Sequence, residues 1–381
     1  MNRRRPSRAD KVLVAGGGVA ALETALALRE LAQGRVEVEL LAPGYEFVYR
    51  PLAVAEPFHT GSIHRFDLAG LTQAAGARHR LGSLTAVYPK KHLARTTKND
   101  LLEYDALVLA LGARPEEAVP GAITFSGRES VPAVQQLIED LVQDAAAEVV
   151  FVVPSSKGWP LPLYELALLT ATYLAERGLS AKLTLVTPEA APLAIFGDEA
   201  SDIMASLLRE HKISIRTETY PRDFDGDVLR VVPGPPISAE RALAMPRLVG
   251  PAVPGIPHDD GGFIPVDEHG QVQGLDDVYA AGDATTFPIK QGGLATQQAD
   301  AVAEHIAAAV GAPVDPKPFR PILRGLVLTG GTPEFLRAEI FRSGRRTSTA
   351  EPDALWWPPG KIAGRYLGPF LAERAEFAYS Y

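Results

Sequence analysis

Apolar residues along this chain fall into short runs separated by amphipathic stretches, which is the pattern of strands alternating with helices. Lys11 to Ala15 forms an apolar run, and Ala20 to Gln33 repeats apolar residues at helical spacing along one side. Val36 to Leu41 alternates between apolar and polar positions, as a strand does. This order of strand, helix and strand predicts a βαβ unit with parallel strands.

Further along the chain the pattern returns, with a strand inside YDALVLALGA at 104–113 and a new series between residues 114 and 245. In that series we predict helices over 131–143 and 164–177 and strands over 148–153 and 182–186. A strand at 277–281, a helix at 294–309 and a hairpin around LRGLVLTGG follow. The chain therefore carries a diverged internal duplication of one architecture.

Segments rich in proline and glycine, ARPEEAVPGA and PRLVGPAVPGIP, mark the places where the chain changes unit. We expect an α/β fold of two Rossmann-like βαβ domains and a small C-terminal cap or interface unit. Residues 1–113 and 246–312 would form the first domain, 114–245 the second, and 313–381 the C-terminal unit. A chain of 381 residues is long enough to build separate cores for these units.

The first strand runs into a glycine turn in VLVAGGGVAALE at 12–23. Gly16, Gly18 and Ala21 occupy the three positions of a dinucleotide fingerprint, which bares backbone N–H groups at a helix N-terminus where a pyrophosphate binds. NAD, NADP and FAD all use this motif. The second strand reaches Ala42 where such units carry an acidic residue for the ribose, so we expect water or backbone to hold the adenosine ribose.

A second glycine signal, VYAAGDA at 278–284, decides between these cofactors. In flavoproteins with two dinucleotide sites, an Asp after a hydrophobic strand bonds a ribityl hydroxyl of FAD, and the next helix points its positive end at the flavin. Gly282 and Asp283 stand in that position. Ala110 and Gly112 are small residues at the end of another strand, where backbone can approach a cofactor closely. The two signals in this order favour noncovalently bound FAD.

Composition narrows the classes of function. Apolar residues make up 46% and charged residues 22%, as in globular enzymes, and a net charge of −8 argues against nucleic acid as a partner. No apolar run reaches the ~20 residues that a membrane helix needs, and we interpret MNRRRPSR as a solvated tail. We therefore expect a cytoplasmic protein with at most a peripheral membrane contact.

Cysteine is absent from the sequence, which excludes disulfides, thiolate metal sites, redox-active cysteine pairs and cysteine nucleophiles. The eight histidines show no ligand spacing such as HExxH, so we predict no metal site. Electrons would have to pass directly between a flavin and a substrate or partner.

The second βαβ unit lacks an intact fingerprint. Flavoproteins that oxidise NAD(P)H carry GxGxxG here, whereas this chain has VVPSSKGWPLPLYELA, in which only Gly158 remains. Pro154 and Pro160 have no N–H to donate, and Trp159 is bulky where backbone must approach phosphate. We predict that NADH and NADPH do not bind here in the usual pose. Trp159 either fills the cleft between the domains or lines the pocket of an aromatic substrate such as a quinone.

These motifs resemble the two-dinucleotide-binding flavoproteins of the pyridine nucleotide-disulfide oxidoreductase-like superfamily, over roughly residues 10 to 310. They are most similar to the branch of sulfide:quinone oxidoreductase, flavocytochrome c sulfide dehydrogenase and type II NADH dehydrogenase. The resemblance rests on VAGGGVAALE, EFVYRP, YDALVLALGA, PSSKGWPLPLYE and AAGDATTFPIKQGG. Sulfide:quinone oxidoreductases pass sulfur through a cysteine pair, and since this chain has no cysteine we expect that it does not use that mechanism.

The resemblance also implies residues beside the flavin ring. The sulfide-oxidising branch places a lysine near the flavin pyrimidine, and IKQGG supplies Lys290, which would stabilise the negative charge of reduced FAD unless it is a solvated loop lysine. Arg50 and Pro51 fall where that branch has residues beside the flavin or the pyrophosphate. The other implied cofactor-binding residues of this loop are Gln291, Gly292 and Gly293.

Glu165 takes the place of a glutamate that follows the second glycine motif in relatives, where it would carry a proton to the flavin, or it would cap the start of the helix. We expect His59 and His64 to lie in a polar surface loop. A group of C-terminal aromatic residues fits a quinone pocket, a peripheral membrane contact or the interface of a homodimer, which we expect. These residues are Trp356, Trp357, Tyr366 and Phe370.

We predict an FAD-dependent oxidoreductase in which Lys290, Trp159 and Glu165 are the candidate catalytic residues. Its donor or acceptor would be a small molecule such as a quinone or dioxygen, or a small redox protein. Two alternatives stay open. One is an NAD(P)H-dependent reductase of type II NADH dehydrogenase character with an unrecognised binding loop, and the other is a flavin-binding sensor or scaffold.

Overall fold

The computed structural model describes residues 9–143, 147–155, 158–340 and 347–374. The arginine-rich tail of residues 1–8 and two residues of the second glycine motif, Ser156 and Lys157, lie outside the described residues. Within the described ranges, no helix is both long enough and apolar enough to cross a membrane.

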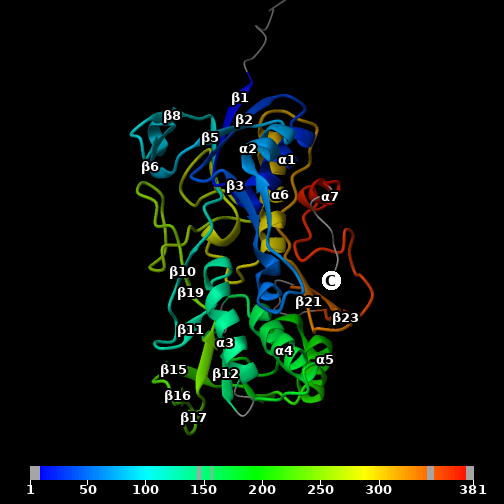
Figure 1. Ribbon diagram of the computed structural model, residues 1–381. Coiled ribbons are helices and arrows are strands. Elements are labelled where there is room, and N and C mark those ends of the chain that lie inside the picture. Colours follow the sequence, from blue (N-terminus) through cyan, green and yellow to red (C-terminus); the bar gives the residue numbers. More distant parts are fainter. Residues whose placement is uncertain (1–8, 144–146, 156–157, 341–346, 375–381) are drawn as a thin grey trace, which may run out of the picture.

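Five parallel strands form the first sheet, in the order β20-β9-β1-β2-β5 (Figure 1). All five carboxyl ends therefore meet at one edge, where ligands of such sheets bind. Helices α1 and α6 pack closely against each other, since both bury many small residues. The bounds are β1 (Asp10–Ala15), β2 (Val36–Ala42), β5 (Arg78–Leu81), β9 (Ala106–Leu109), β20 (Val278–Ala280), α1 (Val19–Leu31) and α6 (Gly292–Ala309).

A second sheet has five strands as well, all parallel, in the order β11-β18-β12-β13-β14. It occupies the green part of the chain at the opposite end of the molecule from β1 (Figure 1). Its strands are β11 (Ile123–Thr124), β12 (Glu148–Val152), β13 (Lys182–Val186), β14 (Ser214–Arg216) and β18 (Arg241–Ala244), with helices α3 (Val131–Gln143), α4 (Leu161–Ala175) and α5 (Asp198–Glu210). The predicted fold class, α/β with two Rossmann-like units, is confirmed.

Two antiparallel strands, β10 (Arg114–Glu116) and β19 (Arg247–Val249), carry the chain from the first sheet to the second and back. The carboxylate of Glu116 on β10 links the two strands. It accepts hydrogen bonds from Arg114 on β10 at 2.9 Å and from Arg247 on β19 at 2.8 Å. The sequence-based domain boundaries at 113 and 246 fall beside these strands and stay a prediction.

Smaller elements surround the two sheets. They include a hairpin on the first unit, a three-stranded meander after β5 and another before β18. Their bounds are β3 (Glu46–Tyr49), β4 (His64–Asp67), α2 (Leu68–Ala74), β6 (Leu84–Tyr88), β7 (Leu93–Thr96), β8 (Leu101–Glu103), β15 (Tyr220–Phe224), β16 (Val228–Val232) and β17 (Ile237–Ser238), with 3₁₀ turns η1 (Arg50–Val54), η2 (Glu56–Phe58), η3 (Pro89–Lys91), η4 (Arg128–Ser130), η5 (Ala194–Phe196) and η6 (Gly282–Ala284).

The C-terminal part begins with the predicted hairpin, which consists of β21 (Ile322–Val327) and β22 (Glu334–Glu339), extended by β23 (Thr349–Glu351). The chain then runs along the side of the molecule and ends the described part with α7 (Leu367–Ala372), which lies beside α1 (Figure 1). This segment therefore bridges the neighbourhood of the second sheet and that of the first.

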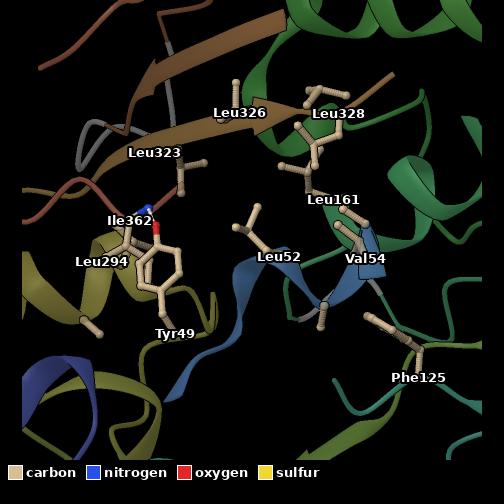
Figure 2. Packing of buried hydrophobic residues seen from close by; sticks show 14 of the residues in the cluster. Tyr49, Leu52, Val54, Phe125, Leu161, Leu294, Leu323, Leu326, Leu328 and Ile362 are labelled. Atoms are coloured by element: carbon tan, nitrogen blue, oxygen red, sulfur yellow. Dashed lines mark hydrogen bonds between the residues drawn. The ribbon is translucent and has the colours of Figure 1, made fainter. Parts of the chain in front are cut away.

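One apolar cluster joins segments that are far apart in the sequence. Figure 2 shows Leu52, Leu161 and Leu323 converging, with Tyr49 and Ile362 beside them. The backbone N–H of Ile362 donates to the Tyr49 hydroxyl at 3.0 Å, which satisfies the polar end of a ring that is 1% exposed. The C-terminal segment is thus built into the core.

A buried carboxylate fixes the start of α7 to α1. Glu23 is fully buried and accepts the backbone N–H groups of Tyr366 at 2.9 Å and Leu367 at 2.7 Å. The carboxyl of Asp300 on α6 contacts the same Glu23 carboxyl, and one of its oxygens has no other partner among the described residues. Burial first, and Glu23 second, raise the pKa of Asp300 to about 9. Asp300 is therefore protonated at neutral pH and can donate to Glu23.

This carboxyl pair predicts a pH dependence of stability. Between the pKa of about 4 of an unfolded Asp and the folded pKa of about 9, the folded protein binds more protons than the unfolded one. Stability therefore falls as pH rises through this window. Asp300→Asn keeps a donor to Glu23 without an ionisable proton, so its Tm at pH 8 should exceed that of wild type by about 3 °C or more.

Differential scanning calorimetry at pH 5 and pH 8 measures this effect. At pH 5 the two proteins should differ much less, because this pH is only about one unit above the pKa of an unfolded Asp, so taking up the proton on folding costs little. Asp202→Asn, at an exposed position of α5, is the control and should leave the pH dependence unchanged. Equal Tm values of Asp300→Asn and wild type at pH 8 would contradict the interpretation.

Candidate functional site

A cavity of about 810 Å³ lies where the carboxyl edge of the first sheet faces α4 and the C-terminal segment. Three parts of the chain line it. From the first unit come Arg50, Pro51, Asp283, Lys290, Gln291 and Gly292, from the second Pro154, Gly158, Trp159 and Glu165, and from the C-terminal part Leu326, Lys361 and Ile362. The other predicted cofactor-binding residues do not line it: Gly16, Gly18 and Ala21 belong to the first glycine turn and α1, Ala110 and Gly112 follow β9, Gly282 follows β20, and Gly293 lies in α6.

The first glycine turn has the geometry that a pyrophosphate requires. Gly16 adopts φ +137°, and a Cβ there would lie 2.1 Å from the carbonyl oxygen of Ala110, so no other residue fits. Gly18 caps α1 without a side-chain hydrogen bond and has open space around its Cα. Ala21 is buried in the first turns of the helix. Free N–H groups at an uncapped helix start can receive an anion.

Gly282 joins this turn to the cavity. Its own position lies between α1 and α6, since a Cβ there would come within 3.3 Å of both Ala20 and Ala295. Its N–H donates to Gln298 Oε1 at 2.6 Å. Gly112 adopts φ +68° just after β9. Gly16, Gly112 and Gly282 thus follow the carboxyl ends of β1, β9 and β20, which are neighbours in the first sheet.

Charged groups of opposite sign meet at the cavity wall. Loss of water raises the pKa of the half-buried Asp283, and the nearby Lys290 and Arg50 oppose that rise. Burial lowers the pKa of Lys290 to about 8, with Asp283 and Asp259 opposing. The Lys290 ammonium donates to the carbonyl of Thr285 and lies 4.0 Å from the centre of the Phe263 ring. Lys290 is therefore a held cation, not a solvated loop lysine.

The residues after Lys290 form the start of α6. Gln291 is 7% exposed, accepts from Leu294 N–H at 3.0 Å and donates to the carbonyl of Arg324 at 2.8 Å. It therefore caps the helix and ties it to β21. Gly292 packs against Ile362, since a Cβ would lie 2.9 Å from that side chain, and Gly293 is buried in the first turn.

A buried ion pair closes the other side of the cavity. Lys361 Nζ contacts Glu165 Oε1, with side-chain exposures of 6% and 2%, and Leu328 N–H donates to the same oxygen at 2.8 Å. Burial raises the pKa of Glu165 and lowers that of Lys361, and each charge opposes the shift of the other. Sequence reasoning missed Lys361, whose only signal was a lysine between PPG and an apolar residue.

One interpretation of Glu165 is wrong. It does not cap a helix start, because α4 begins at Leu161 rather than near Tyr164, and Glu165 lies in the second turn with its carboxylate on Lys361 and Leu328. Three extra residues join the helix because a proline is tolerated in its first turn. The carboxylate therefore points at the cavity's charged wall.

Trp159 lies at the cavity wall, and both interpretations of its role stay predictions. It lines the cavity, and its ring packs edge-on against Phe196 with centroids 5.6 Å apart. Beside it, the backbone N–H of Gly158 donates to the carbonyl of Pro288 at 3.1 Å. In the first turn of α4, Pro162 has no N–H and Leu163 N–H already bonds Pro160. Among the described residues of this segment, the N–H groups of Gly158 and Leu163 are thus occupied, and Pro154, Pro160 and Pro162 have none.

The end of β13 is also occupied by an internal network. Glu189 is 9% exposed and accepts the Tyr164 hydroxyl at 2.8 Å and the Thr187 hydroxyl at 2.9 Å. Burial raises the pKa of Glu189. Acidic residues at this place of a βαβ unit serve a ribose, whereas this one is directed into the protein.

The other singled-out residues lie away from the cavity lining. His59 follows η2 and is exposed, as expected. The placement of His64 in a loop is wrong, because His64 forms part of β4. The ring of His64 lies 6.5 Å from that of Tyr49. Pairing with β3 draws this polar residue into a strand. Trp356 packs on Phe335 with centroids 5.0 Å apart, while Trp357 is 86% exposed.

Comparison with known proteins places this geometry in context. The model of the pyridine nucleotide-disulphide oxidoreductase family matches residues 10–309. The sulfide:quinone oxidoreductase of Aquifex aeolicus is similar in structure with a TM-score of 0.79 at 20% identity, over 90% of this chain and 87% of that one. A ferredoxin reductase of Rhodopseudomonas palustris gives 0.66 at 19%, over 88% and 83%.

NDH2 of Plasmodium falciparum, solved in complex with NADH, gives a TM-score of 0.59 at 17% identity, over 76% of this chain and 67% of that one. At these identities the three structures show a shared fold and no more.

The buried ion pair predicts a characteristic pattern of stabilities. Lys361→Met leaves the Glu165 carboxylate buried without a cation, which should cost about 3–5 kcal/mol. Glu165→Gln combined with Lys361→Met removes both charges and should recover much of that loss. Urea unfolding followed by tryptophan fluorescence measures the unfolding midpoints of wild type, Lys361→Met and the double variant. A double variant that is no more stable than Lys361→Met would contradict a true ion pair.

Proposed function

Because the chain belongs to the pyridine nucleotide-disulphide oxidoreductase family, whose model matches residues 10–309, we propose that FAD binds along the edge from Gly16 to the cavity at Lys290. The protein is an FAD-dependent oxidoreductase. It passes electrons directly between the flavin and a small molecule or a partner protein. A noncovalently held FAD, a homodimer and a cytoplasmic location are parts of the same proposal.

The residues at both ends of this edge fit the cofactor. The open, uncapped start of α1 at Gly18 suits a pyrophosphate, and Asp283 at the cavity wall suits a ribityl hydroxyl. Bound FAD supplies a ring that takes up two electrons and a proton. Arg50 and Lys290 bring positive charge to the place where negative charge would accumulate, and the Lys290 ammonium is already held there by the carbonyl of Thr285.

Glu165 and Lys361 are suited to holding a proton beside the ring. Both are buried, both have a pKa shifted toward the neutral form, and they share one contact. A proton passing from Lys361 to Glu165 would remove both buried charges at once. Trp159, Leu326 and Ile362 give the rest of the wall an apolar character that accepts an uncharged ring, such as that of a quinone.

The second part of the proposal is that NADH and NADPH do not bind in the usual pose. It rests on the hydrogen bond from Gly158 N–H to the carbonyl of Pro288. A pyrophosphate in that pose needs free N–H groups at the loop and the start of the helix. Here the loop glycine is already bonded, and Pro160 and Pro162 have none to give. Glu189, held by two hydroxyls, is not free for a ribose.

The absence of cysteine limits the acceptor chemistry. Sulfur transfer through a cysteine pair and dithiol reduction both need thiolates that this sequence lacks. The similar structures named above include a sulfide:quinone oxidoreductase and a ferredoxin reductase, and we propose an acceptor of one of these two kinds, a quinone-like ring or a small redox protein.

An anaerobic stopped-flow experiment on the purified holoprotein tests the proposal. NADH and NADPH at 100 μM, a concentration within the ~1 μM to 1 mM range of common KM values, should leave the flavin absorbance near 450 nm unchanged over seconds. Dithionite should bleach the same sample and shows that the flavin is reducible. Rapid bleaching by either nicotinamide would overturn the second part of the proposal. A protein that retains no flavin at all would overturn the first.

Lys290 should raise the reduction potential of the flavin. Lys290→Met removes the cation, so the midpoint potential at pH 7 should fall by roughly 20–50 mV, while Lys290→Arg should stay close to wild type. Because the pKa of Lys290 is about 8, the gap between wild type and Lys290→Met should narrow above pH ~9. Dye-equilibrated spectral titration measures the potentials, and a gap that is the same at every pH would count against Lys290.

A further inference from the structure

The carboxyl end of β2 lacks the group that usually receives the adenosine ribose. Ala42 is the last residue of the strand and is 1% exposed. It packs against the glycine turn, since a Cβ built on Gly17 would lie 2.9 Å from the Cβ of Ala42. Gly16 N–H bonds Leu41 and Gly82 N–H bonds Ala42, both at 2.9 Å. The carbonyls of Leu41 and Ala42 are thus already paired within the protein.

An aromatic ring stands three residues further on. Tyr45 is 68% exposed, which makes it the most exposed tyrosine among the described residues, although its neighbour Phe47 is 1% exposed. It lies in the connection between β2 and β3, at the same sheet edge as the glycine turn. The ring of Tyr45 is therefore accessible at the edge where ligands of such sheets bind.

The backbone of Tyr45 is held in place. Its carbonyl accepts the Leu68 N–H at 2.8 Å, at the start of α2, and Asp67 caps that helix through Gly70 N–H at 2.8 Å. The loop is therefore pinned on both sides by β2 and α2, while the ring keeps only its two side-chain torsions. A ring fixed in this way loses little entropy when a flat partner covers it.

We propose that Tyr45 stacks on the adenine of FAD and takes over the anchoring of the adenosine half from the missing ribose carboxylate. The inference rests on the proposed FAD site, since a pyrophosphate at Gly18 directs the adenosine toward β2. Every base has a π face that an aromatic side chain can cover. Tyr45 therefore makes the site selective for the dinucleotide over FMN, which lacks adenine.

Calorimetric titration of the apoprotein with FAD and with FMN tests this inference without any turnover. Wild type should bind FAD more tightly than FMN. Tyr45→Ala should weaken FAD binding about 10-fold to 100-fold and leave FMN binding unchanged, whereas Tyr45→Phe should retain the wild-type preference. Tyr88→Ala is the matched control, because Tyr88 is also exposed, at 39%, but lies on β6.

Three results separate the possible failures. FAD affinity that is the same in Tyr45→Ala and wild type would overturn the role of Tyr45 and leave the proposed function standing. Equal weakening of FAD and FMN would show that the change acts on the fold, and it would overturn the stacking as well. If wild type binds neither flavin, the proposed function itself fails, and the inference fails with it.

Discussion

The ion pair between Glu165 and Lys361 is the interaction on which the arrangement of the site depends. Glu165 belongs to α4 of the second unit, Lys361 to the C-terminal segment, and the Leu328 N–H that completes the carboxylate's partners follows β21. Three parts of the chain thus meet at one buried oxygen. Because an unpaired charge in that position is costly, the three parts are held together, and the cavity keeps its closed side.

The sequence predicted the elements whose signals are local. The turn at Gly16, the Asp283 motif and the helix over 131–143 each follow from neighbouring residues, through backbone conformation or apolar spacing. Partners that lie far away in the chain gave no such signal. Lys361 is 196 residues from Glu165, and Glu23 is 343 residues from Tyr366, so only tertiary packing reveals these bonds.

Whether the second glycine motif can bind a pyrophosphate depends on which of its backbone N–H groups are free. The sequence indicates which N–H groups are missing, namely those of Pro154, Pro160 and Pro162. It does not indicate that the remaining glycine, Gly158, bonds Pro288 in the loop before Lys290. The described end of this segment is instead bonded to the first unit through Gly158, the residue before Trp159.

The place of β20 in the first sheet has a consequence for biosynthesis. β9 ends at residue 109 and its neighbour β20 begins at 278, so about 170 residues must be synthesised between two strands that lie side by side. At ~5–20 residues per second on the ribosome, this takes roughly 10–30 s. All strands of the second sheet, from 123 to 244, emerge within that time. The nascent chain therefore carries an unpaired edge of β9 until β20 has been made, and Asp283 joins the sheet edge only after the whole second sheet.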